Sequence, residues 1–215
     1  MKTKHYIIPL LLSVVLFVSL SSCSKDEDDN GLSGNSGMTM KVDGTEWKSA
    51  MTTLFAEEHE TSGMGEYRLV YIGGSRIIEK NSATEDDLVE SLGLYINIPA
   101  SKFRAPKGTY PIIVKETELS HAWGIFSSST DIRDATLYVS GDPEDQDKRV
   151  GTLEITAFEI GNQSVFGQGT QVEGYTKLSG NFQLEVYPMV GTGSKLKLTE
   201  GKFNLTSGIG IDFGW

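Results

Sequence analysis

Alternating apolar and polar residues, interrupted by short glycine-containing turns, run through most of this chain. The clearest example centres on Asp43-Gly44, the dipeptide favoured in the type I′ turn that joins two antiparallel strands. A two-residue loop there pairs Met40 with Trp47 on one face and Lys41 with Glu46 on the other. One face of the hairpin is then apolar and the other carries an opposite-charge pair, which cross-strand pairing favours.

A second set of alternating residues flanks Glu200-Gly201 near the C-terminus. Interpreted as another hairpin turn, this dipeptide sets Leu198 against Phe203 and Leu196 against Leu205. A slip of one residue would mix the apolar and polar faces, so the alternation specifies this register well.

Further strands are predicted where short alternating runs are rich in β-branched and aromatic residues. They are Leu54–Glu57, Arg68–Ile72, Leu92–Ile98, Thr109–Val114, Trp123–Phe126, Ala135–Ser140, Leu153–Ile160 and Phe182–Tyr187. The apolar phase changes within Leu153–Ile160, which indicates a β-bulge near Ala157–Phe158. The acidic stretch Ala83–Leu92 has few apolar positions, so we expect a loop with at most one helical turn.

Roughly ten short strands without βαβ alternation predict an all-β fold, either an antiparallel β-barrel or a β-sandwich. Closure or two packed layers would bury the inward faces and protect the strand edges. We expect one such domain over residues 38–215, preceded by a flexible tether over residues 23–37.

The N-terminus is typical of a secretory signal. Lys2 and Lys4 precede an apolar run over residues 6–20, and small residues lead into Cys23. The apolar run is about 15 residues long, whereas a membrane-spanning helix needs about 20. We therefore expect residues 1–22 to be removed as a signal peptide rather than kept as an anchor helix.

The sequence Leu20-Ser21-Ser22-Cys23 resembles the lipobox of bacterial lipoproteins. In that family a diacylglycerol is attached to the cysteine sulfur, and the chain is cut just before the cysteine. The resemblance implies a lipid on Cys23 that binds the protein to a membrane, which two or three acyl chains do firmly. Cys23 is the only cysteine, so it has no internal disulfide partner.

An acidic run, Lys25-Asp26-Glu27-Asp28-Asp29, follows the cysteine, and a Gly/Ser/Asn-rich segment follows the run. Both are typical of a disordered tether. The acidic run also resembles the export signal of surface lipoproteins of the Bacteroidota. This implies an outer-membrane lipoprotein that faces the cell exterior; a plain spacer on a periplasm-facing lipoprotein is the alternative.

The net charge of −10 argues against nucleic acid as a partner. Metal sites are poorly supported, because His59 and His121 are far apart and have no cysteine nearby. The loop Asp142–Asp147 offers carboxylates for Ca²⁺ but lacks the glycine and terminal glutamate of an EF-hand, so an acidic hairpin loop is the simpler interpretation.

No nucleophile or nucleotide motif is present, and Glu154 and Glu159 give no reason to infer a glycosidase. We expect neither catalysis nor a cofactor.

Three tyrosines, Tyr95, Tyr138 and Tyr187, lie out of phase with the apolar residues beside them. Outward tyrosines can stack on sugars or contact a partner protein. The alternatives are ordinary cross-strand pairing, or the second face of a closed core.

Several short motifs resemble those of small Bacteroidota lipoproteins of unknown function. They are Met38–Trp47 (M-x-x-x-V-D-G-x-x-W), Gly108–Pro111 (G-T-Y-P), Gly151–Thr156 (G-T-L-x-I-T), Gly180–Phe182 (G-x-F) and Gly201–Leu205 (G-x-F-x-L). The resemblance implies a compact antiparallel β domain, barrel-like in the lipocalin manner, and supplies no catalytic residues. We expect a cell-surface binding module for a glycan, a small apolar ligand or a protein. An accessory subunit of an outer-membrane or pilus-type assembly is the alternative, and a hydrolase is the least supported hypothesis.

Overall fold

The computed structural model describes residues 36–56, 60–63, 65–80, 87–113, 120–129, 136–164, 171–190 and 193–211. The first seven elements are β1 (Gly37–Val42), β2 (Thr45–Lys48), β3 (Met51–Ala56), β4 (Glu60–Ser62), β5 (Gly65–Lys80), β6 (Asp87–Pro99) and the 3-10 turn η2 (Ala100–Lys102). The remaining strands are β7 (Gly108–Ile112), β8 (His121–Ser129), β9 (Thr136–Val139), β10 (Gly151–Ser164), β11 (Gln171–Pro188), β12 (Leu196–Thr206) and β13 (Gly208–Ile211).

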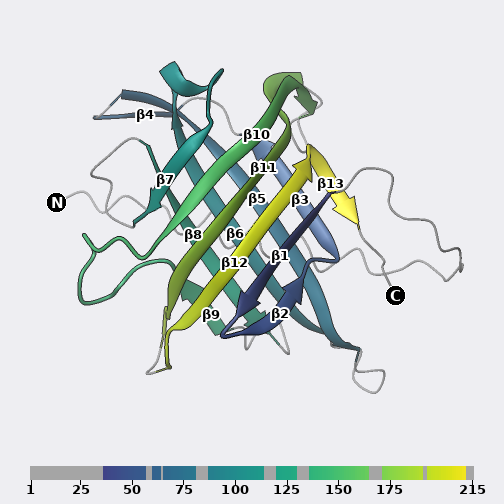
Figure 1. The fold of residues 1–215 in the computed structure, drawn as a ribbon, viewed down its shortest axis with the longest axis vertical. Helices are drawn as coiled ribbons and strands as arrows, with labels where there is room; N and C mark the ends of the chain where they lie inside the picture. The colour runs from purple at the N-terminus through teal and green to yellow at the C-terminus, as the bar shows by residue number, and fades with distance from the viewer. Residues whose placement is uncertain are drawn as a thin grey trace, which may run out of the picture. The chain divides into compact units, whose positions relative to one another are not determined.

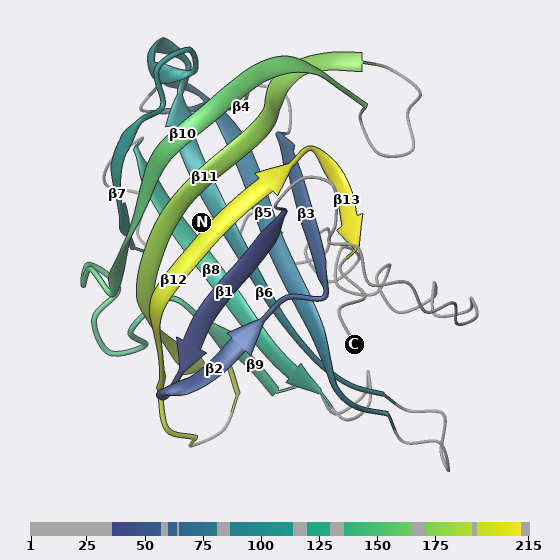
Figure 2. The same cartoon turned by 45° about the vertical axis from the view of Figure 1, so that its right-hand side comes forward.

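The prediction of an all-β fold is confirmed: the strands form one sheet in the order β13-β3-β5-β6-β8-β7-β10-β11-β12-β1-β2. Strand β4 adds to β5, and β9 joins β8 to β11. Every pairing is antiparallel except the single bridge between β7 and β8. The sheet curls over itself, so that β10, β11, β12 and β1 cross in front of β5, β6 and β8 (Figures 1 and 2).

A bend between β2 and β3 connects the two halves of the curled sheet. Strand β2 pairs with β1 in one half, whereas β3 pairs with β5 in the other. At the bend, the Ser49 amide donates to the Met38 carbonyl at 2.9 Å and the Ala50 amide donates to the Ser75 carbonyl at 2.7 Å. The described strands therefore form a curled sheet whose inner faces meet, an arrangement consistent with either the predicted β-barrel or the predicted β-sandwich.

The first predicted hairpin is confirmed in detail. Met40 pairs with Trp47 and Lys41 pairs with Glu46, around a turn in which Asp43 and Gly44 both have positive φ. The predicted bulge in β10 is also present, as a register shift between Ile155 and Ala157, one to two residues before the expected place.

The second predicted hairpin is wrong. Glu200-Gly201 lies inside the continuous strand β12, which pairs with β1 on one side and β11 on the other. Glu200 has φ 53°, and the register shifts here against both neighbouring strands. The dipeptide is thus a bulge that inserts one extra residue, so that Leu198 before it and Phe203 after it both face the core.

The expected loop over Ala83–Leu92 is also incorrect in its second half. Strand β6 begins at Asp87, and its pairing to β5 and β8 outweighs the weak local apolar pattern. Among the described residues, no helix is long and apolar enough to cross a membrane.

The inner faces of both halves form one hydrophobic cluster. Its largest fully buried members include Trp47, Tyr175, Phe126 and Met38. Burial of each large apolar side chain contributes about 1.5–3 kcal/mol, so this shared cluster is the main source of stability.

Side chains of the segment after β6 cover one end of the core. Phe103 follows η2 and is 5% exposed, with its ring 4.9 Å from that of Tyr175. The Tyr175 hydroxyl donates to the Phe103 carbonyl at 2.7 Å, and the Tyr110 hydroxyl donates to the Pro106 carbonyl at 2.7 Å. Burial raises the pKa of Tyr110 to about 12, so both hydroxyls keep their protons and remain donors at physiological pH.

Residues 1–22, Cys23, the acidic run and the tether up to residue 35 lie outside the described residues. The signal peptide, the lipidation site and the export signal therefore stay predictions.

Candidate functional site

Four aromatic side chains form one row across four neighbouring strands. Phe55 on β3 pairs with Tyr71 on β5, Tyr71 pairs with Tyr95 on β6, and Tyr95 pairs with Trp123 on β8. Their strand neighbours, such as Leu54, point to the core, so the four rings lie on the opposite, outer side of the sheet.

The rings of the row contact one another. Centroids are 4.8 Å apart for Phe55 and Tyr71, 4.9 Å for Tyr71 and Tyr95, and 3.9 Å for Tyr95 and Trp123. The last pair is stacked with an interplanar angle of 7°. Because the rings occupy one another's faces, all four are half-buried although they lie outside the core.

A pair of opposed glycines makes room for the centre of the row. Gly73 on β5 faces Gly93 on β6, and the Tyr71 ring lies over both. A Cβ added at Gly73 would lie 2.6 Å from the Tyr71 hydroxyl, and one at Gly93 would lie 3.0 Å from its ring. Burial, with the nearby Tyr95, raises the pKa of Tyr71, so this hydroxyl stays protonated.

The surface around the row carries no Asp, Glu, Lys or Arg at any position that the structure describes there. We call it the aromatic face; its members are Met51, Thr53, Phe55, Leu69, Tyr71, Gly73, Ser75, Ile77, Val89, Ser91, Gly93, Tyr95, Asn97, His121, Trp123, Ile125, Ser127, Leu137 and Val139. In a chain with 29 acidic and 19 basic residues, such a face departs from the ordinary solvated face of a strand. Ile77 is the exposed member of this set, whereas Thr53, Asn97, His121 and Ser127 are buried and the other members are buried or half-buried.

The outer side of the other half of the sheet is charged. We call it the polar face; its members are Thr39, Lys41, Thr152, Glu154, Lys177, Asn181, Gln183, Glu185, Lys197, Lys202 and Asn204. Ion pairs join Lys177 to Glu159 at 2.9 Å and Lys41 to Glu200 at 2.8 Å. The two outer faces of one sheet therefore differ sharply in charge.

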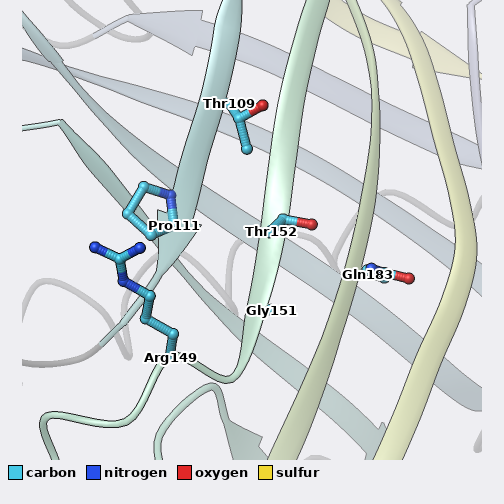
Figure 3. A pocket seen from close by; sticks show the side chains of 6 residues that line it. All are labelled: Thr109, Pro111, Arg149, Gly151, Thr152 and Gln183. Atoms are coloured by element: carbon cyan, nitrogen blue, oxygen red, sulfur yellow. The ribbon is translucent and has the colours of Figure 1, made fainter.

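A hollow of about 550 Å³ opens on the polar side, next to the turn into β10. It is lined by Thr109, Pro111, Arg149, Gly151, Thr152 and Gln183. The Arg149 side chain rises toward Pro111, while Thr152 and Gln183 stand on the neighbouring strands (Figure 3). Its lining residues are mostly exposed, and no buried polar group points into it, so it is a shallow depression rather than a built site.

The structure does not bring the three predicted tyrosines together. Tyr95 faces outward as expected and is part of the aromatic row. Tyr138 instead packs against the core, with its ring 6.3 Å from that of Phe126. The Tyr187 ring also packs against the core. The strand register pairs Tyr138 with the core residue Phe126, which the local phase of one short segment could not reveal. Tyr187 instead pairs with Val139 of the aromatic face, so its packing against the core comes from its position at the end of β11 and not from its register.

The hydroxyl of Tyr187 belongs to a charged network at the end of β11. It donates to Glu185 at 3.1 Å, and Lys148 lies 3.5 Å away. Lys195 forms an ion pair with Glu185 at 2.8 Å and holds the pKa of that carboxyl below its usual range.

The loop Asp142–Asp147 is closed by its own contacts. Asp142 accepts from Lys148 at 2.8 Å and from the Glu144 amide at 3.0 Å, and Asp145 accepts from the Asp147 amide at 3.2 Å. The Lys148 hydrogen bond, followed by that of the Glu144 amide, lowers the pKa of Asp142. Within the described residues, no group of three or more His, Cys, Asp or Glu is placed to hold a metal ion.

The remaining candidate catalytic or metal-binding residues do not form a common site. His121 is 2% exposed, and its Nε2 lies 3.1 Å from the Asn97 amide nitrogen, so it belongs to a buried polar pair at the margin of the aromatic face. Glu154 contacts Asn181, whereas Glu159 is paired with Lys177. His59 lies outside the described residues.

Comparison with protein-family models, curated proteins and solved structures finds no match. The candidate site is therefore supported only by the geometry of the aromatic row in this chain. Sequence reasoning missed Phe55, Tyr71 and Trp123, although each is out of phase with buried neighbours as Tyr95 is. What was missing was the pairing between distant strands that aligns the four.

Proposed function

We propose that this chain is a lipid-anchored lipoprotein of the cell surface that works as a non-catalytic binding module for a protein partner. The uncharged aromatic face carries the proposal. Cores of protein interfaces are depleted in charge and enriched in Tyr, Trp, Phe and Met. This face is uncharged and carries Met51, Phe55, Tyr71, Tyr95 and Trp123. An accessory subunit of an outer-membrane or pilus-type assembly would be a special case of the same function.

The filled interior disfavours a small apolar ligand. A lipocalin-like carrier needs an enclosed cavity, whereas inward side chains from both halves of this sheet form one contiguous cluster that includes Leu94, Leu153 and Phe182. The hollow lined by Thr109, Arg149 and Gln183 is open and lies on the polar side.

A glycan is a weaker match than a protein. Sugar rings stack on exposed aromatic faces, but Tyr95 and Trp123 stack on each other and Phe55 stacks on Tyr71. The row therefore offers ring edges and an extended apolar surface, which suits a polypeptide surface better.

The proposed anchor rests on the lipobox resemblance and is tested separately from binding. In Cys23→Ala, the protein should leave the membrane fraction and appear in the soluble fraction. Retention of this variant in the membrane fraction would contradict the anchor.

The binding role is tested by photocrosslinking on intact cells. A photoreactive phenylalanine analogue at Ile125, on the aromatic face, should crosslink to a protein, and Tyr95→Ala with Trp123→Ala should abolish the product. The matched control carries the analogue at Thr152, on the polar face, and should give none. Crosslinking from Thr152 alone, or from neither position, would overturn the proposal; glycan-array binding lost in the same variant would replace the protein partner with a glycan.

A further inference from the structure

One junction in the curled sheet is not closed by backbone pairing. Strand β3 pairs with β5 as far as Ser75, and β5 then continues to Lys80 with β6 as its only neighbour among the described strands. Strand β2 ends the path of the sheet and pairs with β1 alone within the same part of the chain. We call the junction between β2 and the residues of β5 after Ser75 the seam.

Side chains close the seam in place of a ladder. The Trp47 ring on β2 lies against Gly74 of β5, where an added Cβ would be 3.1 Å from the ring. Arg76 on β5 reaches across to β2, and its Nη1 donates to the Glu46 carbonyl at 3.0 Å. The same guanidinium pairs with Glu90 at 2.9 Å and lies 5.9 Å from the centre of the Trp47 ring. One arginine therefore joins the two sides of the seam.

The closed seam carries two energetic costs. Trp47 is 1% exposed, yet its indole Nε1 has no hydrogen-bond partner. A buried donor without a partner has lost its hydration and gained no hydrogen bond in return. The Arg76 and Glu90 side chains are 25% and 14% exposed, so their pairing also requires the partial desolvation of two charges. Opening of the seam relieves both costs, because water then reaches the indole and the ion pair.

The chain has a bend beside the seam that can act as its hinge. Ser49 and Ala50 form this bend, where the chain passes from β2 into β3 (Figure 2). The Met38 amide donates to Ser49 Oγ at 2.9 Å, and the Ala50 amide donates to the Ser75 carbonyl at 2.7 Å. The bend is thus fixed to both halves of the sheet, whereas β2 beyond it contacts β5 through side chains.

We propose that the seam is a gate in the wall of the domain, with Arg76 as its latch. When the contacts of Arg76 with Glu46 and Glu90 break, β2 moves away from β5 about the bend, and the Trp47 side chain becomes accessible to solvent. The other strand pairings stay formed, so the motion is a local opening and not global unfolding. The gate is a property of the folded domain and depends neither on the lipid anchor nor on the partner of the aromatic face.

Hydrogen exchange of the Trp47 indole N–H measures the opening. The signal is assigned by its loss in Trp47→Phe, and the reference is the set of backbone amides at the centre of β11, which pairs on both sides. We expect a lower protection factor for the indole than for these amides. Its exchange should also be nearly independent of urea at low concentration, because a local opening exposes little surface.

Two arginine variants separate the latch from general stability. Arg76→Met keeps much of the side-chain length but loses the latch, and should raise the indole exchange rate at least tenfold. Arg104→Met is the matched control, because it breaks the ion pair with Glu173 at the other end of the sheet. It should leave the indole rate unchanged, since the open and closed forms of the seam both keep that ion pair.

Each outcome decides the proposal. Equal protection and equal urea dependence for the indole and the β11 amides would show that Trp47 exchanges only by global unfolding, which overturns the gate. An equal rise in Arg76→Met and Arg104→Met would remove the role of the latch. If Arg76→Met does not fold, Glu90→Gln takes its place: it keeps an acceptor for Arg76 but no charge, and should give a smaller rise of the same kind. An unchanged rate in Glu90→Gln would then overturn the proposal.

Discussion

Single residues in this sheet are constrained by how closely neighbouring backbones and rings approach. Gly180 on β11 is the tightest case: an added Cβ would lie 1.9 Å from the Glu154 carbonyl oxygen and 2.6 Å from the Phe203 ring. Gly37 on β1 has nothing within 4 Å of the same position. Gly180 and Gly37 both lie in strands, but only Gly37 has room for a larger side chain.

Gly180→Ala should lower the free energy of unfolding by about 1–3 kcal/mol or more, because the methyl group forces apart two backbones that have no room to move. Gly37→Ala should be neutral or stabilising by up to about 1 kcal/mol, because alanine loses less conformational entropy on folding. Urea denaturation measures both, and equal destabilisation of the two variants would contradict the explanation.

The ion pair between Asp142 and Lys148 predicts a pH dependence. The pKa of Asp142 is lowered in the folded state, so its contribution to stability is present at neutral pH and is lost as pH falls through that lowered pKa. Carboxyl-carbon NMR titration should show the Asp142 pKa rising in Lys148→Met, but not fully to its ordinary value because the Glu144 amide still donates. Lys202→Met, on the polar face, should leave it unchanged; a similar rise in both would refute the assignment.

At the scale of elements, bulges decide which side chains reach the core. The bulge at Glu200-Gly201 lets one strand present Leu198 and Phe203 to the same interior, although they are an odd number of residues apart. An uninterrupted strand would place one of them outside. The extra residue is therefore structural even though its side chain is exposed.

Deletion of Glu200 should be far more damaging than its substitution. Without the extra residue, Leu196 and Leu198 exchange faces with their polar neighbours, and each large apolar side chain exposed costs about 1.5–3 kcal/mol. Glu200→Gly keeps the count, relieves the positive φ and loses one exposed ion pair, so its stability should stay within about 1 kcal/mol of the parent chain. Guanidinium denaturation compares the two, and similar midpoints would show that the bulge does not set the phase.

At the scale of the whole molecule, the two outer faces of the sheet differ in charge. The polar face carries ion pairs such as Lys177–Glu159, whereas the uncharged aromatic face would bind the partner in the proposed function. The N-terminal segment adds the proposed lipid and the proposed export signal, which together would decide on which side of the membrane the aromatic face is presented.

Neutralising the acidic run tests the direction in which the protein faces. Replacement of Asp26, Glu27, Asp28 and Asp29 by Asn or Gln should leave the protein in the membrane fraction, because Cys23 is untouched. Labelling of intact cells with a membrane-impermeant amine reagent should fall to the background of a periplasmic control. Undiminished labelling would show that the run is a plain spacer.

The local sequence determined much of the secondary structure. Period-two alternation and the Asp43-Gly44 turn predicted the first hairpin to the residue, because both strands and their turn lie within about ten residues. The bulge in β10 was also visible as a change of phase along one strand.

Tertiary structure decided what alternation leaves open. Glu200-Gly201 has the composition of a turn, yet pairing with β1 and β11 on both sides keeps β12 continuous through it, with the dipeptide accommodated as a bulge. Tyr138 and Tyr95 have the same local phase signal, but their strands meet different neighbours, and one ring turns to the core while the other joins Phe55, Tyr71 and Trp123. The physical reason is that alternation is a property of one strand, whereas the aromatic row exists only because strands distant in sequence pair in register.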